Sequence, residues 1–239
     1  MWFVEAGLDK VGRIQADGTI SEFPGSPLLG DLNALGFDTN GSVWIAGTNS
    51  HYVARMRQNG DLKVIELPYD GDSPPQLPWG SQSIVLAGDG SVWISESQWP
   101  IVRVDKNGSI SRVAVPGPVL SLVVGPDGDP RYIIGMNLDP TMALVTLHPD
   151  GSTASVSISP RYETSEPLAH EILGSDGALW SAGYHWFYRV ALDGSLKRYW
   201  IPGDNPEPAS FAQRDGGPIW AIGQESWSIV LWKLVLADK

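Results

Sequence analysis

The sequence has no cysteine, no long apolar run and few charged residues. Without cysteine the chain can form neither a disulfide, nor a thiolate metal site, nor a cysteine nucleophile. No stretch reaches the about 18 consecutive apolar residues that a transmembrane helix needs. Residues 1–20 also lack the basic, apolar and small-residue regions of a signal peptide. These absences predict a cytoplasmic protein.

Positive charge is scarce as well. The chain carries 16 Lys and Arg against 27 Asp and Glu, a formal net charge of −11, and its basic residues are scattered. Such a charge repels phosphate backbones and anionic lipid. We therefore expect neither a nucleic acid nor a membrane as a partner, and the oligomeric state stays open.

Glycine, proline and tryptophan are abundant, with 27, 19 and 11 copies in 239 residues. This composition is typical of a turn-rich all-β protein and supports a single domain over residues 1–239. An aromatic residue begins each of six units, at spacings of 42, 49, 39, 48 and 40 residues. The six positions are Trp2, Trp44, Trp93, Tyr132, Trp180 and Trp220.

Two series of glycine turns punctuate the units, and both predict hairpins in which glycine adopts a positive φ. One series precedes the aromatic residue: Asn40-Gly41, Asp89-Gly90, Asp127-Gly128, Asp176-Gly177 and Asp215-Gly216. The other follows it: Asp17-Gly18, Asn59-Gly60, Asn107-Gly108, Asp150-Gly151 and Asp193-Gly194.

Each complete unit therefore has four strands: inner, aromatic, arginine-bearing and outer. A sheet with two apolar faces is not stable alone, whereas radial stacking of similar units buries both faces. We predict an all-β fold, a β-propeller of about six four-stranded blades, either complete or part of a seven-bladed ring. The first unit lacks an inner strand and the last lacks an outer strand. An open sandwich is the alternative fold.

An arginine recurs at one position of the third strand, at Arg13, Arg55, Arg103 and Arg189. This recurrence favours a structural role between blades over catalysis.

The first unit resembles the repeat of the streptogramin B lyases in three consecutive segments, Met1–Glu5, Val11–Ile14 and Asp17–Pro24. The resemblance extends more loosely over all units, with Val123–Gly128 similar to the family's inner strand and turn. It implies a propeller that opens a cyclic depsipeptide by elimination at an ester, with Mg²⁺. It also implies a His base on an inner strand and a Glu fourteen residues later.

Candidate site residues follow from that pattern, although no His-to-Glu pair has the family's spacing. The Glu position holds Glu5 and Glu96, and fourteen residues before Glu96 stands Gln82. His170, on the fifth inner strand, is the candidate base, and Tyr184 lies fourteen residues after it. We expect His170 and Glu96 to be catalytic, Glu5 and Glu96 to bind Mg²⁺, and Gln82, Tyr184 and His185 to contact substrate.

Each assignment has an alternative. Glu5 and Glu96 are either paired magnesium ligands or solvated residues at strand ends, and His170 is either a base or a structural residue lining the channel. His51 and His148 are weaker candidates. As a whole, the chain is either a lyase or a non-catalytic propeller that binds a small molecule, cyclic peptide or carbohydrate. In the second case, Trp79, Trp99 and Trp227 are candidate contact residues.

Overall fold

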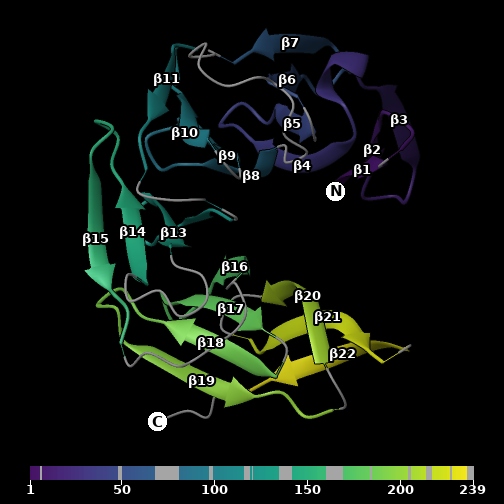
Figure 1. Ribbon diagram of the computed structural model, residues 1–239. Coiled ribbons are helices and arrows are strands. Elements are labelled where there is room, and N and C mark those ends of the chain that lie inside the picture. Colours follow the sequence, from purple (N-terminus) through teal and green to yellow (C-terminus); the bar gives the residue numbers. More distant parts are fainter. Residues whose placement is uncertain are drawn as a thin grey trace. The chain divides into compact units, whose positions relative to one another are not determined.

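The computed structural model describes residues 1–5, 7–47, 50–67, 81–96, 99–115, 119, 121–134, 142–159, 169–183, 185–203, 206–213, 217–226 and 228–235. These residues form two compact units, Met1–Leu122 (unit 1) and Val123–Lys239 (unit 2), each with three antiparallel sheets (Figure 1). No helix among them is long and apolar enough to cross a membrane. Whether the chain is one domain stays a prediction.

Unit 1 contains one three-stranded sheet and two four-stranded sheets. The strands are β1 (Trp2–Glu5), β2 (Lys10–Ile14) and β3 (Ile20–Pro24); then β4 (Leu32–Phe37), β5 (Val43–Gly47), β6 (Tyr52–Met56) and β7 (Leu62–Glu66); then β8 (Ser81–Leu86), β9 (Val92–Glu96), β10 (Trp99–Val104) and β11 (Ile110–Val113). A short 3-10 helix, η1 (Pro27–Leu29), precedes β4.

Unit 2 contains two four-stranded sheets and one three-stranded sheet. The strands are β12 (Val123–Val124), β13 (Pro130–Ile134), β14 (Ala143–Leu147) and β15 (Thr153–Ser157); then β16 (Ala169–Leu173), β17 (Leu179–Gly183), β18 (Trp186–Val190) and β19 (Leu196–Trp200); then β20 (Pro206–Gln213), β21 (Ile219–Glu225) and β22 (Ser228–Leu234).

The six sheets match the six predicted repeat units. Within the described residues the first sheet lacks the inner strand and the last lacks the outer strand, as the sequence predicts. Four sheets, rather than all six, are therefore four-stranded.

The predicted glycine turns are confirmed wherever the structure describes them. Nine of the turn glycines have φ between 72° and 91°. In the turn before β9, Ala87 N donates to Ser91 O at 2.9 Å and Gly90 N donates to Ala87 O at 3.0 Å. This pair of hydrogen bonds, with glycine in the left-handed region, is the three-residue hairpin loop with a glycine bulge. Asp215-Gly216 lies outside the described residues.

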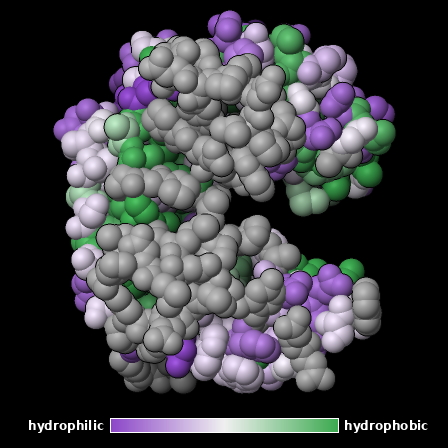
Figure 2. Space-filling model, in the orientation of Figure 1, coloured by the Kyte–Doolittle hydropathy of each residue, from purple (hydrophilic) through white to green (hydrophobic). Residues whose placement is uncertain are grey.

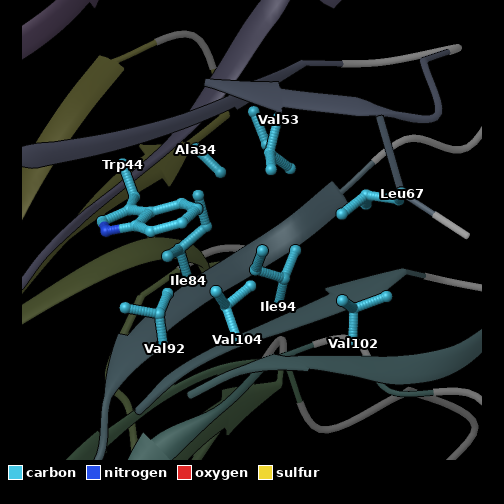
Figure 3. Packing of buried hydrophobic residues seen from close by; sticks show 10 residues of the cluster. Ala34, Trp44, Val53, Leu67, Ile84, Val92, Ile94, Val102 and Val104 are labelled. Carbon is cyan, nitrogen blue, oxygen red and sulfur yellow. The ribbon is translucent and has the colours of Figure 1, made fainter. Parts of the chain in front are cut away.

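Neighbouring sheets within each unit pack face to face through apolar side chains. In unit 1, Trp44, Ala34 and Val53 of one sheet point toward Ile84 and Ile94 of the next (Figure 3). In unit 2, side chains of β16–β19 pack in the same way on β20–β22. Full burial of one such side chain contributes about 1.5–3 kcal/mol, so this repeated packing supplies most of the stability of each unit.

The fourth sequence repeat, which forms the sheet β12–β15, departs from the predicted pattern by one residue. Trp44, Trp93 and Trp180 each lie opposite an arginine of the next strand, but the residue at the equivalent position of β13 is Arg131, opposite Thr146. Tyr132 is therefore not the equivalent of the tryptophans. It points to the other face of the sheet and is fully buried, and this burial raises the pKa of its hydroxyl group.

Three of the recurrent arginines have a structural ion pair within their own sheet. Arg55, Arg103 and Arg189 pair with Asp38, Asp89 and Asp176, each in the glycine turn of the same sheet, at 2.6 to 2.8 Å. In the fourth unit, Arg131 replaces both the tryptophan and the arginine, because it reaches Asp127 from the tryptophan position.

Candidate functional site

The predicted site residues that the structure describes lie at the same end of their own sheets. Glu5 and Glu96 end β1 and β9, Gln82 and His170 are second in the inner strands β8 and β16, and His185 directly precedes β18. In an antiparallel sheet, the start of an inner strand and the end of the next strand are neighbours. The glycine turns before the aromatic strands lie at the opposite end.

In unit 1 the fold brings Gln82 and Glu96 onto adjacent strands. Ser81 lies opposite Glu96 and Ser83 opposite Ser95, so Gln82 is the extra residue of a β-bulge. A bulge redirects a side chain and is often found beside functional sites. The side chains of Gln82 and Glu96 lie outside what the structure describes.

Glu5 has a cation beside it. It pairs across β1 and β2 with Lys10, whose ammonium is 2.5 Å from the Glu22 carboxylate. The hydrogen bond to Glu22 and the charges of Glu22 and Glu5 raise the pKa of Lys10. Lys10 thus places a positive charge near Glu5, while its ammonium pairs with Glu22.

In unit 2 a second bulge contains the candidate base. Ala169 lies opposite Ala182 and Ile172 opposite Trp180, so His170 and Glu171 together face one residue of β17. Simple alternation of faces therefore fails at this point, so their adjacent positions in the sequence do not place His170 and Glu171 on opposite faces of the sheet. Glu171 is buried, with 7% of its surface exposed. The side chain of His170 lies outside what the structure describes.

His185 belongs to an aromatic cluster that the sequence analysis missed. Its ring stacks on Trp200, with centroids 5.0 Å apart and planes 6° apart. Trp186 meets Trp200 edge to face at 5.1 Å, and the Arg198 guanidinium lies 4.1 Å from the Trp186 ring centroid. Trp200 is 56% exposed. We call these four residues the His185 cluster.

The register explains why the His185 cluster forms, and could have revealed it. Trp186 and Trp200 lie directly opposite each other on β18 and β19, and Ile201 N donates to His185 O at 2.8 Å. Trp200 is the last residue of the outer strand β19, two residues before Pro202, so the sequence alone indicates only its place in that strand. Tyr184 lies outside the described residues.

The remaining histidines have structural partners. His148 Nδ1 is 2.8 Å from an Asp129 carboxylate oxygen, and the His51 ring packs on Tyr52. Trp79 and Trp227 lie outside the described residues, as does the side chain of Trp99.

The described side chains do not by themselves form the expected magnesium site. Across the described ranges, no group of three or more His, Asp or Glu residues is placed to hold a metal ion. Glu5 has Lys10 beside it, and the side chain of Glu96 is outside the described set. Mg²⁺ therefore stays an expectation from the resemblance.

Comparison with known proteins gives the fold class. No protein-family model matches the chain. A virginiamycin B lyase from Staphylococcus aureus superposes with a TM-score of 0.80 at 22% identity, covering 99% of this chain and 76% of that one. A gluconolactonase from Xanthomonas campestris superposes with a TM-score of 0.63 at 13% identity, covering 93% and 78%. The chain is an all-β protein of the β-propeller class.

A sequence relative confirms the predicted resemblance. A virginiamycin B lyase of Nocardia farcinica is 25% identical over 159 residues, which is 66% of this chain. The match spans about half of that relative, 51% of its length. The chain is thus a propeller similar to the virginiamycin B lyases.

Proposed function

We propose that the chain is a streptogramin B lyase-like enzyme that opens a cyclic depsipeptide by elimination at an ester. The observation that carries this proposal is the place of His170. It lies in a bulge at the start of an inner strand, in a chain whose repeat resembles that of the lyases.

The proposed step needs no water. The imidazole of His170 removes a proton from the carbon beside a carbonyl, and the electron pair of that C–H bond forms a carbon–carbon double bond. The C–O bond of the ester breaks, and the carboxylate leaves with its electron pair. The linear product then has the mass of the cyclic substrate, whereas hydrolysis would add one water.

A β-propeller offers a suitable position for this chemistry, because side chains at one end of several sheets can converge on one ligand. Gln82 and Glu96 occupy that end of their sheet, and His170 and His185 occupy the corresponding end of theirs. In this proposal His170 is the base in unit 2, and Glu96, Gln82, Tyr184 and His185 keep the catalytic and substrate-binding roles that the family resemblance implies. Mg²⁺ is part of the proposal only through the family resemblance.

The test is incubation of the purified chain with the streptogramin B depsipeptide quinupristin, with and without Mg²⁺, followed by mass spectrometry. We expect a linear product of unchanged mass. The His170→Ala variant should be slower by at least about 100-fold. His148→Ala is the matched control, because His148 pairs with Asp129 beside a glycine turn. Equal rates in the two variants would remove His170 from the assignment.

The His185 cluster favours a second candidate, binding of a ligand without turnover. An exposed tryptophan stacked on a histidine, with a second tryptophan at its edge, offers a flat apolar surface with polar groups nearby. Such a surface suits a cyclic peptide or a sugar ring. This candidate predicts saturable calorimetric binding of quinupristin or cellohexaose with no product. Trp200→Ala should weaken it, whereas Trp220→Ala, in another sheet, should not.

A further inference from the structure

Unit 1 contains a cavity at the opposite end of the sheets from the predicted catalytic residues. Its volume is about 500 Å³, within the range of small-molecule sites. It lies between the sheet β4–β7 and the sheet β8–β11. One wall carries Trp44, Arg55 and Lys63, and the other carries the turn Asp105, Lys106 and Asn107.

The first wall is a row across three strands. Trp44 lies opposite Arg55, and Arg55 lies opposite Lys63. Side chains directly opposite each other point to the same face of a sheet, so two cations stand side by side here. Like charges in this position destabilise a sheet.

Both carboxylates of the cavity are already supplied with donors. Asp38 accepts hydrogen bonds from Arg55 Nε at 2.6 Å and from Ser42 N at 3.0 Å. Asp105 accepts from the backbone N–H groups of Ser109 and Asn107, both at 2.8 Å. The hydrogen bond from Ser109 lowers the pKa of Asp105, so its carboxylate is charged and held within its own turn.

The two lysines of the cavity differ from its carboxylates in their hydrogen bonds and ion pairs. Among the described residues, neither Lys63 nor Lys106 has a hydrogen bond or an ion pair. Three cations thus face two carboxylates, which gives the cavity lining a net charge of +1. Arg55 pairs with Asp38, and the charges of the described lining without an ion-pair partner are those of Lys63, Lys106 and Asp105. This is a local excess of positive charge in a chain of net charge −11.

We propose that this cavity binds a small organic anion, a molecule with a phosphate or carboxylate group and a compact apolar body. The ammonium groups of Lys63 and Lys106 bind the anionic group through charge-assisted hydrogen bonds. The half-buried apolar side chains of Ile65 and Ile110 contact the body of the ligand. Asn40 and Asn107 supply further polar contacts at the rim.

The fold provides a matched control for Lys63. In β17–β19, Trp180, Arg189 and Lys197 form the same cross-strand row, and Arg189 pairs with Asp176 as Arg55 does with Asp38. Lys197 lies outside the cavity. Lys63→Met and Lys197→Met therefore remove the same charge from equivalent positions, one inside the proposed site and one outside it.

The experiment is a titration of the full chain, followed by amide and indole NMR resonances, with phenyl phosphate, benzoate and neutral benzyl alcohol. We expect saturable shifts at Gly90, Asn107 and the Trp44 indole with one or both anions. The stronger anion identifies phosphate or carboxylate as the preferred group. Lys63→Met should weaken binding about tenfold, and Lys197→Met should leave the affinity unchanged.

A stability measurement separates binding from a structural role. Because Lys63 stands opposite Arg55, Lys63→Met should leave the melting temperature unchanged or higher while the affinity falls. Three outcomes overturn the proposal: no saturable shift, equal binding of benzyl alcohol, or equal loss of affinity in the two lysine variants. None of them bears on the lyase assay, which concerns the other end of the sheets.

Discussion

At the scale of single residues, the most telling feature is how an aspartate is satisfied in each glycine turn. Three sheets use an arginine of the third strand for this purpose, whereas the fourth unit uses Arg131 from the second strand. The guanidinium of Arg131 fills the space beside Gly125, where a Cβ would lie 1.3 Å from its Nη1 atom. The pairing is therefore maintained although the residues that provide it have changed.

This pair predicts a loss of stability in acid. The hydrogen bond from Arg131 lowers the pKa of Asp127 from 3.8 to about 2. Because the folded pKa is the lower one, the stabilisation is complete above the unfolded value. It is lost as the pH falls from about 4 to about 2. We expect urea unfolding of the wild type to show this loss, and Asp127→Asn to reduce it.

At pH 7, Asp127→Asn should lower the free energy of unfolding by about 1–2 kcal/mol, because it leaves the buried guanidinium without its anion. This is less than for a fully buried pair, since the Asp127 side chain is 53% exposed. Asp150→Asn is the control, because Ser152 rather than an arginine lowers the pKa of Asp150. Equal effects of the two substitutions would show that the Arg131 pair contributes nothing specific.

At the scale of elements, the inner strands β4 and β8 pack so closely that their contact requires glycine. A Cβ on Gly36 would lie 2.4 Å from Ile84 Cγ2 and 2.9 Å from the Ile84 carbonyl oxygen. The Ile84 carbonyl group cannot move without disturbing β8, whereas a substitution can shorten the Ile84 side chain. Gly36 therefore fixes how near two neighbouring sheets of unit 1 approach.

We expect Gly36→Ala to lower the free energy of unfolding by about 1–3 kcal/mol through overpacking. When it is added to the Gly36→Ala variant, Ile84→Ala should recover part of that loss of free energy, because it removes Cγ2 but not the carbonyl oxygen. Chemical denaturation of the two single variants and the double variant gives the coupling energy. Strictly additive effects would mean that the sheets separate to accommodate the methyl group.

Much of the element scale could be predicted from the sequence, because the turn chemistry is local. A glycine after Asp or Asn marks a hairpin at each of the nine turns of this kind that the structure describes. The six sheets and their incomplete first and last members therefore followed from the turns. The bulges at Gln82 and His170 could not be predicted, because an extra residue in one strand shows only against its partner strand. The same holds for Arg131, whose position becomes clear only from its pairing with Thr146.

The candidate site was predictable only as far as its residues lie on identifiable strand ends. Gln82 and Glu96 were paired by a spacing, and the register of β8 and β9 places them together. The His185 cluster was missed, because its members are separated in sequence and meet across β18 and β19. The charged cavity in unit 1 was missed too, since neither Lys63 nor Lys106 belongs to a motif.

At the scale of the whole molecule, the fold of this chain is shared with known proteins much more closely than its sequence is. The lyase from Staphylococcus aureus superposes over 99% of the chain at only 22% identity. A gluconolactonase superposes as well, so the fold admits more than one chemistry. What distinguishes this chain is therefore the set of side chains at the ends of its sheets and the faces that remain exposed.

One sheet face stands out by its exposure. In β5, Trp44 and Ala46 are buried against the next sheet, but their equivalents in β21, Trp220 and Ile222, are 37% and 47% exposed. Leu231, opposite Ile222, is 59% exposed. Figure 2 shows hydrophobic surface at the margin of the part of unit 2 that carries β20–β22. Exposed apolar patches on a sheet favour association with other apolar surfaces.

We therefore expect the chain to self-associate reversibly as its concentration rises, and the double variant Ile222→Thr/Leu231→Thr to remain monomeric in sedimentation velocity. Threonine is compatible with a strand, and both sites face solvent, so each change should alter the free energy of unfolding by less than about 0.5 kcal/mol. Leu8→Thr is the control, because Leu8 is 65% exposed in the turn between β1 and β2 and belongs to another sheet. If the double variant and Leu8→Thr sediment alike, association does not depend on the β21–β22 face.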